Sequence, residues 1–177
     1  LTGTYAAVCA LRMLDMAGID FENTEVCAMI TDGEEAGLRG CKQWAKDHYD
    51  EYVNSGVETA VLCVDTLADL EYLRVYNKDM TGTVKNNQQF SQLVMDSAKD
   101  SGHNDLEFSS VYFGSSDAAA FSQAGITATC LAAMDPKPAD YYHNRRDTAE
   151  RLVPEAIKTG FDVIISTILN FDEKGLN

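Results

Sequence analysis

The sequence predicts an α/β protein, a three-layer sandwich in which helices cover both faces of a mixed, mostly parallel central sheet. The first observation is that segments with helical periodicity alternate with short apolar segments along the whole chain, which is typical of this class. The second is that the chain, at 177 residues, is long enough for one full core and contains no linker, repeat or low-complexity segment. We therefore expect one domain over residues 1–177.

The first part of the chain predicts a helix at 5–16, a strand at 26–31 and a helix at 37–52. Apolar residues recur at helical spacing in the first helix, and Gly18 ends it. The segment 26–31 is mostly apolar, which predicts a strand buried on both faces. The second helix carries its apolar residues on one side, where Trp44 contributes to the core together with Tyr5 and Met13 of the first helix.

The rest of the chain continues the alternation. We expect strands at 59–65 and 72–76, a helix at 88–101, a strand at 108–113, a short helix that ends near Ser122, a strand at 126–132, an irregular loop at 134–148 and a helix at 154–171. The helix at 88–101 stops near Gly102, the short helix follows a polar cap at 114–117, and the last helix has Pro154 in its first turn.

Composition excludes several classes of function. The formal charge of -14 argues against a nucleic-acid partner and against docking on anionic membranes. No apolar run approaches the roughly 18 residues that a membrane-spanning helix needs. The five cysteines show no CxxC spacing, which argues against cysteine-ligated zinc and against a disulfide framework and indicates free thiols in a reducing, cytoplasmic compartment. The sequence does not determine the oligomeric state.

The sequence is expected to begin partway through the predicted domain. The chain opens at Leu1 without an initiator Met or a signal peptide, and Thr4 is placed to cap the helix that follows directly. We therefore expect a domain that is incomplete at its amino terminus.

The most informative segment is 30–40, where an apolar stretch ends in the adjacent acids Glu34 and Glu35, flanked by glycines. A bound cation would relieve the repulsion between the two carboxylates and separate them into a ligand and a base; the alternative is a solvated acidic turn. Asp65 and His143 follow two other expected strands, and sites in open α/β sheets form outside the carboxyl ends of strands. Carboxylates and imidazole together suit zinc.

Four blocks, in order, resemble one family. Residues 32–40 resemble the GEExGLxGS signature of the di-zinc aminopeptidases, whose clan includes glutamate carboxypeptidase and glutaminyl cyclase. The pair 64–65 resembles the family's strand-end aspartate, 142–148 its YHTxxDT block, and 115–126 its SDHxxF…GIP segment, although Ala118 replaces the histidine.

The resemblance implies a role for each of five residues. Glu34 would be the general base, Glu35 a ligand to one zinc ion, and Asp65 and His143 ligands to the other. Tyr142 would donate to the oxyanion, with neighbouring Tyr141 as an alternative. Asp117 would either orient this site or simply cap its helix.

The resemblance also implies that two metal ligands of the family are absent from these residues. The opening Leu1-Thr2-Gly3 fits the tail of the family's D-N-x-S-G block, so two metal ligands, one of them bridging both ions, would precede Leu1. We expect the parent protein to cleave amino-terminal peptide bonds of peptide substrates with a zinc-activated water, and this chain alone to be inactive. The alternatives are a non-catalytic binding or scaffold domain, or a carboxypeptidase or cyclase built on the same metal cage.

Overall fold

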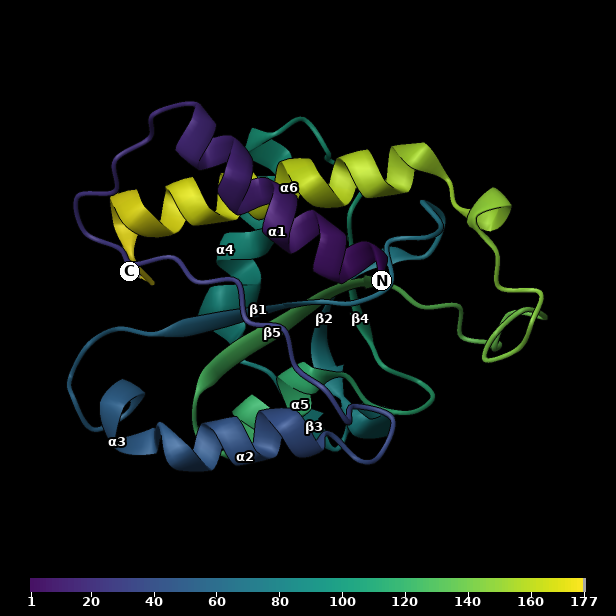
Figure 1. Cartoon of the computed structure of the whole chain (residues 1–177), viewed down its shortest axis with the longest axis horizontal. Helices are drawn as coiled ribbons and strands as arrows, with labels where there is room; N and C mark the ends of the chain where they lie inside the picture. Colours follow the sequence, from purple (N-terminus) through teal and green to yellow (C-terminus); the bar gives the residue numbers. More distant parts are fainter. Residues whose placement is uncertain (177) are drawn as a thin grey trace.

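The computed structural model describes residues 1–176, and its secondary-structure elements form three layers (Figure 1). One face of the sheet is covered by α1 (Thr2–Met16), α4 (Gln88–Asp100) and α6 (Pro154–Lys174). The other face is covered by α2 (Arg39–Asp47) and α5 (Asp117–Gln123), and α3 (Tyr49–Tyr52) follows α2. Short 3-10 helices lie at Met80–Gly82 and Ala149–Arg151. The predicted α/β sandwich is confirmed.

The sheet contains β1 (Ala60–Val64), β2 (Leu73–Asp79), β3 (Val84–Lys85), β4 (Phe108–Ser110) and β5 (Thr127–Ala133). Its order is β1-β5-β2-β3, and β4 also pairs with β2. The pairings of β1 with β5 and of β2 with β4 are parallel, whereas β2 runs antiparallel to β5 and β3. The parallel pairings join more residues than the antiparallel ones, so the sheet is mixed and mostly parallel, as predicted.

Each face of the sheet has its own apolar core. Val94 of α4 and Val163 of α6 are fully buried with Leu131 of β5 on one face. Phe121 of α5 and Cys130 of β5 are buried with α2 on the other. Burying each side chain of this size contributes about 1.5–3 kcal/mol, so packing from both sides holds β5 at the centre.

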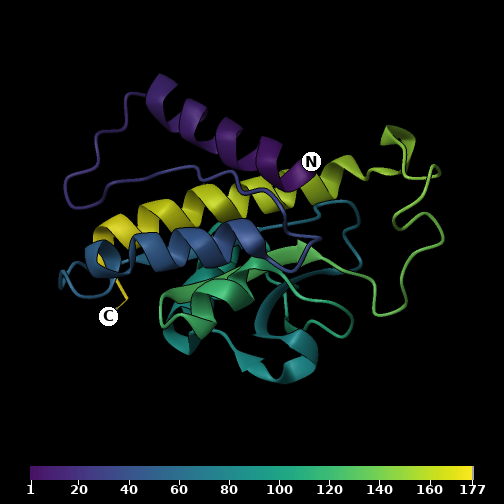
Figure 2. The ribbon, with the colours of Figure 1, turned by 60° about the horizontal axis from the view of Figure 1, so that its bottom comes forward.

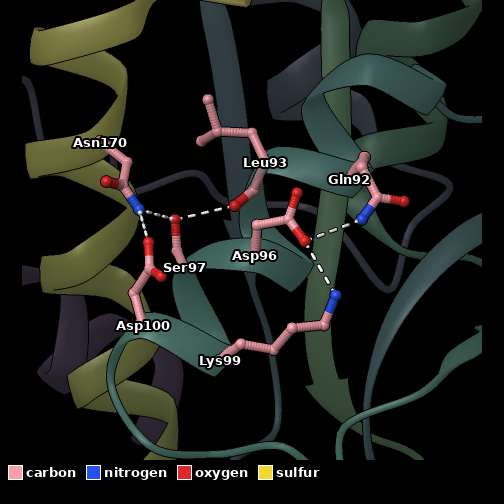
Figure 3. Close-up of polar contacts among 7 residues, drawn as sticks. All are labelled: Gln92, Leu93, Asp96, Ser97, Lys99, Asp100 and Asn170. Carbon is pink, nitrogen blue, oxygen red and sulfur yellow. Dashed lines mark hydrogen bonds and ion pairs between the residues drawn. The ribbon is translucent and has the colours of Figure 1, made fainter.

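A side-chain cap explains where α4 begins, and polar contacts explain how α4 meets α6. The Asn87 side chain accepts a hydrogen bond from the backbone of Phe90 at 2.9 Å, which caps α4. Figure 3 shows the contact between the helices: the Asn170 amide of α6 donates to Ser97 at 2.9 Å and to Asp100 at 3.0 Å. Polar side chains thus set the alignment of two helices whose facing sides are otherwise apolar.

Several expectations about the amino-terminal part are wrong. Within residues 1–176, the segment 26–31 pairs with no strand and is not buried on both faces, since Ile30 is 66% exposed. A strand exists only where a neighbour accepts and donates its backbone hydrogen bonds, and β1, the nearest strand, does not do so. The chain between α1 and α2 runs without a strand (Figure 2), and the second helix breaks at His48. Tyr5 and Met13 lie on the exposed side of α1, whereas Trp44 packs against the core.

Candidate functional site

A tight turn between the unpaired segment and α2 carries the adjacent acids Glu34 and Glu35. Gly33 opens the turn with a left-handed φ of 65°, and the backbone of Gly40 donates to the carbonyl of Asp32 at 3.1 Å. A Cβ at Gly40 would lie 2.4 Å from that carbonyl oxygen, so only glycine fits this close approach. The glycines therefore fold the chain back on itself and present both carboxylates at the start of α2.

Glu34 is half-buried among other charged groups. Burial of its carboxyl, together with the neighbouring carboxylates of Glu35, Asp65 and Asp117, raises its pKa to about 7, while His143 opposes this shift. A carboxyl with such a pKa can both accept and release a proton near neutral pH, which is the property that a general acid–base group needs.

Glu35 and His143 are in direct contact. The Glu35 Oε1 and His143 Nε2 atoms are 2.8 Å apart, although both side chains are largely exposed. The ring of Tyr142 stacks on the imidazole, with centroids 3.8 Å apart, and His143 adopts a left-handed φ of 54°. A left-handed conformation is strained in a residue other than glycine and persists only where surrounding contacts hold it. Here the stacking and the ion pair together hold the imidazole against the turn.

Tyr142 belongs to the same group of side chains. Partial burial raises the pKa of its phenol, and the charges of Glu35, Glu34 and Asp65 raise it further. The phenol therefore keeps its proton at neutral pH and remains a hydrogen-bond donor.

Asp65 follows β1 directly, at the carboxyl end of the strand. Its backbone N–H donates to Leu131 of β5 at 3.2 Å, which fixes the position of the side chain at the sheet edge. Burial raises the pKa of the carboxyl, the Thr66 hydroxyl lowers it through a hydrogen bond, and the Asp117 charge raises it. Asp65 thus faces the same acidic cluster as Glu34.

Asp117 lies in the first turn of α5, whose N-cap residue is Ser116. One carboxylate oxygen accepts a hydrogen bond from the Thr31 hydroxyl at 2.8 Å, while the other is buried without a partner within residues 1–176. A buried oxygen of this kind costs free energy unless a donor or a cation meets it. Asp117 is therefore aimed at the site, and its place at a strand-to-helix junction was the sequence signal for it.

The structure brings Glu34, Glu35, Asp65, His143 and Tyr142 into one region, while their individual roles remain predictions. The oxygen and imidazole donors are of the kind that zinc prefers, and the partnerless oxygen of Asp117 agrees with a nearby cation. Across residues 1–176, however, no three His, Cys, Asp or Glu side chains are placed to hold a metal ion together. The donor chemistry therefore fits a metal better than the present placement of the side chains does.

Two further ionisable side chains have structural roles. Asp79 is fully buried and accepts hydrogen bonds from the backbone and hydroxyl of Ser116. His103 lies outside the site, where its imidazole contacts Asp162 at 3.0 Å.

Residues 2–168 match the family described as peptidase family M28. No curated protein matches the chain.

Solved structures of three proteins are similar in fold. LapB from Legionella pneumophila is 15% identical with a TM-score of 0.78 over 97% of this chain and 45% of its own. BSAP, a zinc aminopeptidase from Bacillus subtilis, is 18% identical with a TM-score of 0.70 over 94% and 40%. A glutaminyl cyclase from an Acidobacteriales bacterium is 17% identical with a TM-score of 0.61 over 78% and 47%. The chain thus spans less than half the length of each of these proteins.

Proposed function

The chain belongs to peptidase family M28, and from this premise we propose that the whole protein is a metal-dependent aminopeptidase that hydrolyses amino-terminal peptide bonds of peptides. The observation that carries the proposal is the half-buried Glu34, whose pKa of about 7 suits proton transfer and whose neighbours are the carboxylates and imidazole of the predicted site. The fold shared with an enzyme described as a zinc aminopeptidase supports it.

Each side chain has a distinct part in the proposed reaction. Glu35, Asp65 and His143 would hold zinc, two ions in the complete protein, and the bound metal would polarise the scissile carbonyl and lower the pKa of a water. Glu34 takes a proton from the attacking water and passes it to the leaving amine. Tyr142, protonated at neutral pH, donates a hydrogen bond to the developing oxyanion.

We also propose that residues 1–177 alone are inactive. Within residues 1–176, no three His, Cys, Asp or Glu side chains are placed to hold a metal ion together, and Glu35 and His143 are in direct contact at 2.8 Å. The test compares turnover of leucine p-nitroanilide with zinc by this chain and by the full-length protein. We expect turnover only from the latter, and turnover by this chain alone would contradict the proposal.

A mutation identifies the base. In the full-length protein, Glu34→Gln should lower kcat by about 10²- to 10⁴-fold, the usual contribution of general acid–base catalysis. The matched control is Glu51→Gln in α3, which removes the same charge outside the site. An unchanged kcat in the Glu34 variant would refute its role as the base.

A cyclase is the second candidate, favoured by the fold shared with a glutaminyl cyclase. Free and acetylated peptides that begin with glutamine separate the reactions: an aminopeptidase releases the first amino acid, whereas a cyclase converts the free amino terminus to pyroglutamate without cleavage. A carboxypeptidase would release the last amino acid from both peptides. A non-catalytic binding domain would leave every peptide unchanged even when the protein is complete and loaded with zinc.

We propose a cytoplasmic location. None of the helices in residues 1–176 has the length and the apolar character needed to cross a membrane. The five cysteines are free, which agrees with a reducing compartment. Cell fractionation with an antibody to the chain tests the proposal, and recovery in a secreted or membrane fraction would contradict it.

A further inference from the structure

A β-bulge near the end of β2 turns Asp79 toward α5. The pairing of β2 with β4 shifts register between Tyr76 and Lys78, so β2 contains one residue more than its partner strand there. Because successive side chains of a strand point to opposite faces, the extra residue reverses the alternation. Asp79 therefore lies on the same face as Tyr76, which is buried in the core beneath α5. Its neighbour in β3, Val84, packs against that core as well.

The Asp79 carboxylate is fully buried, and most of its hydrogen bonds come from one residue. One oxygen accepts from the backbone N–H of Met80 at 2.7 Å and from that of Ser116 at 3.0 Å. The other oxygen accepts from the Ser116 hydroxyl at 2.6 Å. A buried carboxylate is costly unless hydrogen bonds compensate for the lost water. The contact with Ser116 supplies most of that compensation.

Ser116 is the N-cap residue of α5, but its hydroxyl does not cap the helix. A serine in this position usually accepts a hydrogen bond from a backbone N–H of the first helical turn. Among the residues described, no side chain makes such a cap for α5, because the Ser116 hydroxyl donates to Asp79 instead. The start of α5 is thus fixed to the end of β2 by a tertiary contact in place of a local one.

The residue that follows Ser116 extends this contact to the candidate site. One oxygen of Asp117 accepts a hydrogen bond from the Thr31 hydroxyl at 2.8 Å. Thr31 lies three residues before Glu34, at the entrance to the turn that carries the adjacent acids. A chain of contacts therefore runs from Asp79 through the start of α5 to the turn that bears Glu34.

The backbone next to Asp79 is strained. Met80 and Thr81 both have left-handed conformations, with φ values of 46° and 56°. Strain of this kind persists only where surrounding contacts hold it, and it gathers at functional positions. Here the hydrogen bond from the Met80 N–H to Asp79 holds the strained turn. The carboxylate thus joins the strained turn on one side to α5 on the other.

The carboxyl end of α5 has a similar polar contact, which serves as a comparison. Asn86 is buried, and its amide donates to the carbonyl of Tyr76 at 2.7 Å. Its side-chain oxygen accepts from the hydroxyl of Ser122, near the end of α5, at 2.7 Å. Asn86 therefore fastens the same helix to the same strand, but at the opposite end of the helix from Asp117.

We propose that Asp79 is a positioning residue for the candidate site. By binding the backbone and hydroxyl of Ser116, it sets the position of the Asp117 carboxylate and, through Thr31, of the turn that bears Glu34. Its effect on turnover rests on the proposed peptidase function, whereas its effect on the turn does not.

The first test needs no activity. The backbone N–H groups of residues 36–40 donate to the carbonyls of residues 32–34, so their hydrogen exchange in the full-length protein reports on the turn. Asp79→Asn places an amide donor against the Ser116 hydroxyl and should make these groups exchange at least about tenfold faster, through loss of a hydrogen bond to a charged group. Asn86→Ala, the matched control, should leave their exchange within about twofold. An equal change in both variants, or none in Asp79→Asn, would overturn the proposal.

The second test is kinetic and uses the full-length protein with zinc and leucine p-nitroanilide. Asp79→Asn should lower kcat by about 10- to 100-fold and leave KM within about threefold, because it misplaces reacting groups without removing a contact to the substrate. Asn86→Ala should retain kcat. In a Thr31→Val background, Asp79→Asn should lower kcat far less, since the path to the turn is already broken. A purely structural role would make the two losses of kcat additive, and additive losses would refute positioning.

Together the two tests separate this proposal from the proposed function. If exchange in the turn changes as expected and the unmodified full-length protein hydrolyses no peptide, the peptidase proposal fails and the positioning of the turn by Asp79 stands. If Asp79→Asn does not fold, Ser116→Ala takes its place in both tests, because it removes the hydroxyl that donates to Asp79.

Discussion

Replacing Glu34 by glutamine should change how the stability of the chain depends on pH. The pKa of this carboxyl is about 7 in the folded chain, against an ordinary value of 4.5. Between these two values the folded state binds more protons than the unfolded state, so the free energy of unfolding falls as the pH rises. The stabilisation is complete below about pH 4.5 and is lost as the pH rises through 7.

The size of the effect follows from the shift. Each pH unit by which a pKa is raised corresponds to about 1.4 kcal/mol, which sets an upper limit of about 3 kcal/mol for Glu34. Because the side chain is only half-buried, water screens its interactions, and we expect about 1–2 kcal/mol. In Glu34→Gln this part of the decline should vanish.

The assay is urea unfolding at pH 5 and at pH 8 for the parent chain, Glu34→Gln and the control Glu51→Gln, which lies in α3 away from the site. The parent and the control should lose about 1–2 kcal/mol more stability between the two pH values than the Glu34 variant does. Carbon NMR of the Glu34 carboxyl should show a midpoint near 7. An ordinary midpoint, or the same pH dependence in all three proteins, would refute the argument from burial and neighbouring carboxylates.

Three further changes test two contacts at the site and one between α4 and α6. Thr31→Val removes the 2.8 Å hydrogen bond to Asp117 and should lower the free energy of unfolding by about 1–3 kcal/mol in urea melts. Gly40→Ala places a Cβ 2.4 Å from the carbonyl oxygen of Asp32 and should destabilise the turn by about 1–3 kcal/mol, seen as faster hydrogen exchange at the start of α2. Asn170→Ala removes two hydrogen bonds between α4 and α6 and should lower stability by about 1–2 kcal/mol in thermal melts.

These three predictions have their own controls. Thr59→Val also removes a threonine hydroxyl, but one whose partner is an exposed backbone carbonyl, and should cost less than Thr31→Val. Unchanged hydrogen exchange at the start of α2 in Gly40→Ala would show that the turn accommodates the added Cβ without destabilisation. A loss in Asn170→Ala no larger than that in Lys174→Ala, on the same helix, would mean that apolar packing alone sets the alignment of α4 and α6.

Elements with strong local signals were predicted correctly. Asn87 before α4, Pro154 at the start of α6 and the polar cap before α5 mark helix ends through groups within a few residues of the chain. The strands β1 and β5 are continuous apolar runs that lie next to each other in the sheet. Residue type and near neighbours were sufficient to predict these elements. In the helices the partners of the backbone groups are close in sequence, and in the strands a buried neighbouring strand supplies them.

The segment 26–31 shows where local chemistry fails. Its composition suits a buried strand, but a strand also needs a neighbour on each paired edge, and β1 lies across a cavity from it. The two-residue strand β3 was missed for the opposite reason: Val84 and Lys85 have no apolar run, and they pair because the chain turns back beside the end of β2.

By itself, the amino-acid sequence determined the α/β class, most helix and strand positions, and the chemical identity of the carboxylates and imidazole in the candidate site, because each depends on residue type and on neighbours close along the chain. Only the tertiary structure decided that Glu35 contacts His143 directly. It also decided that, among the residues described, Asp117 keeps one buried oxygen without a partner and β1 has one edge without a paired strand. Those features depend on distances between segments far apart in sequence, which are set by how the two helical layers pack against the sheet.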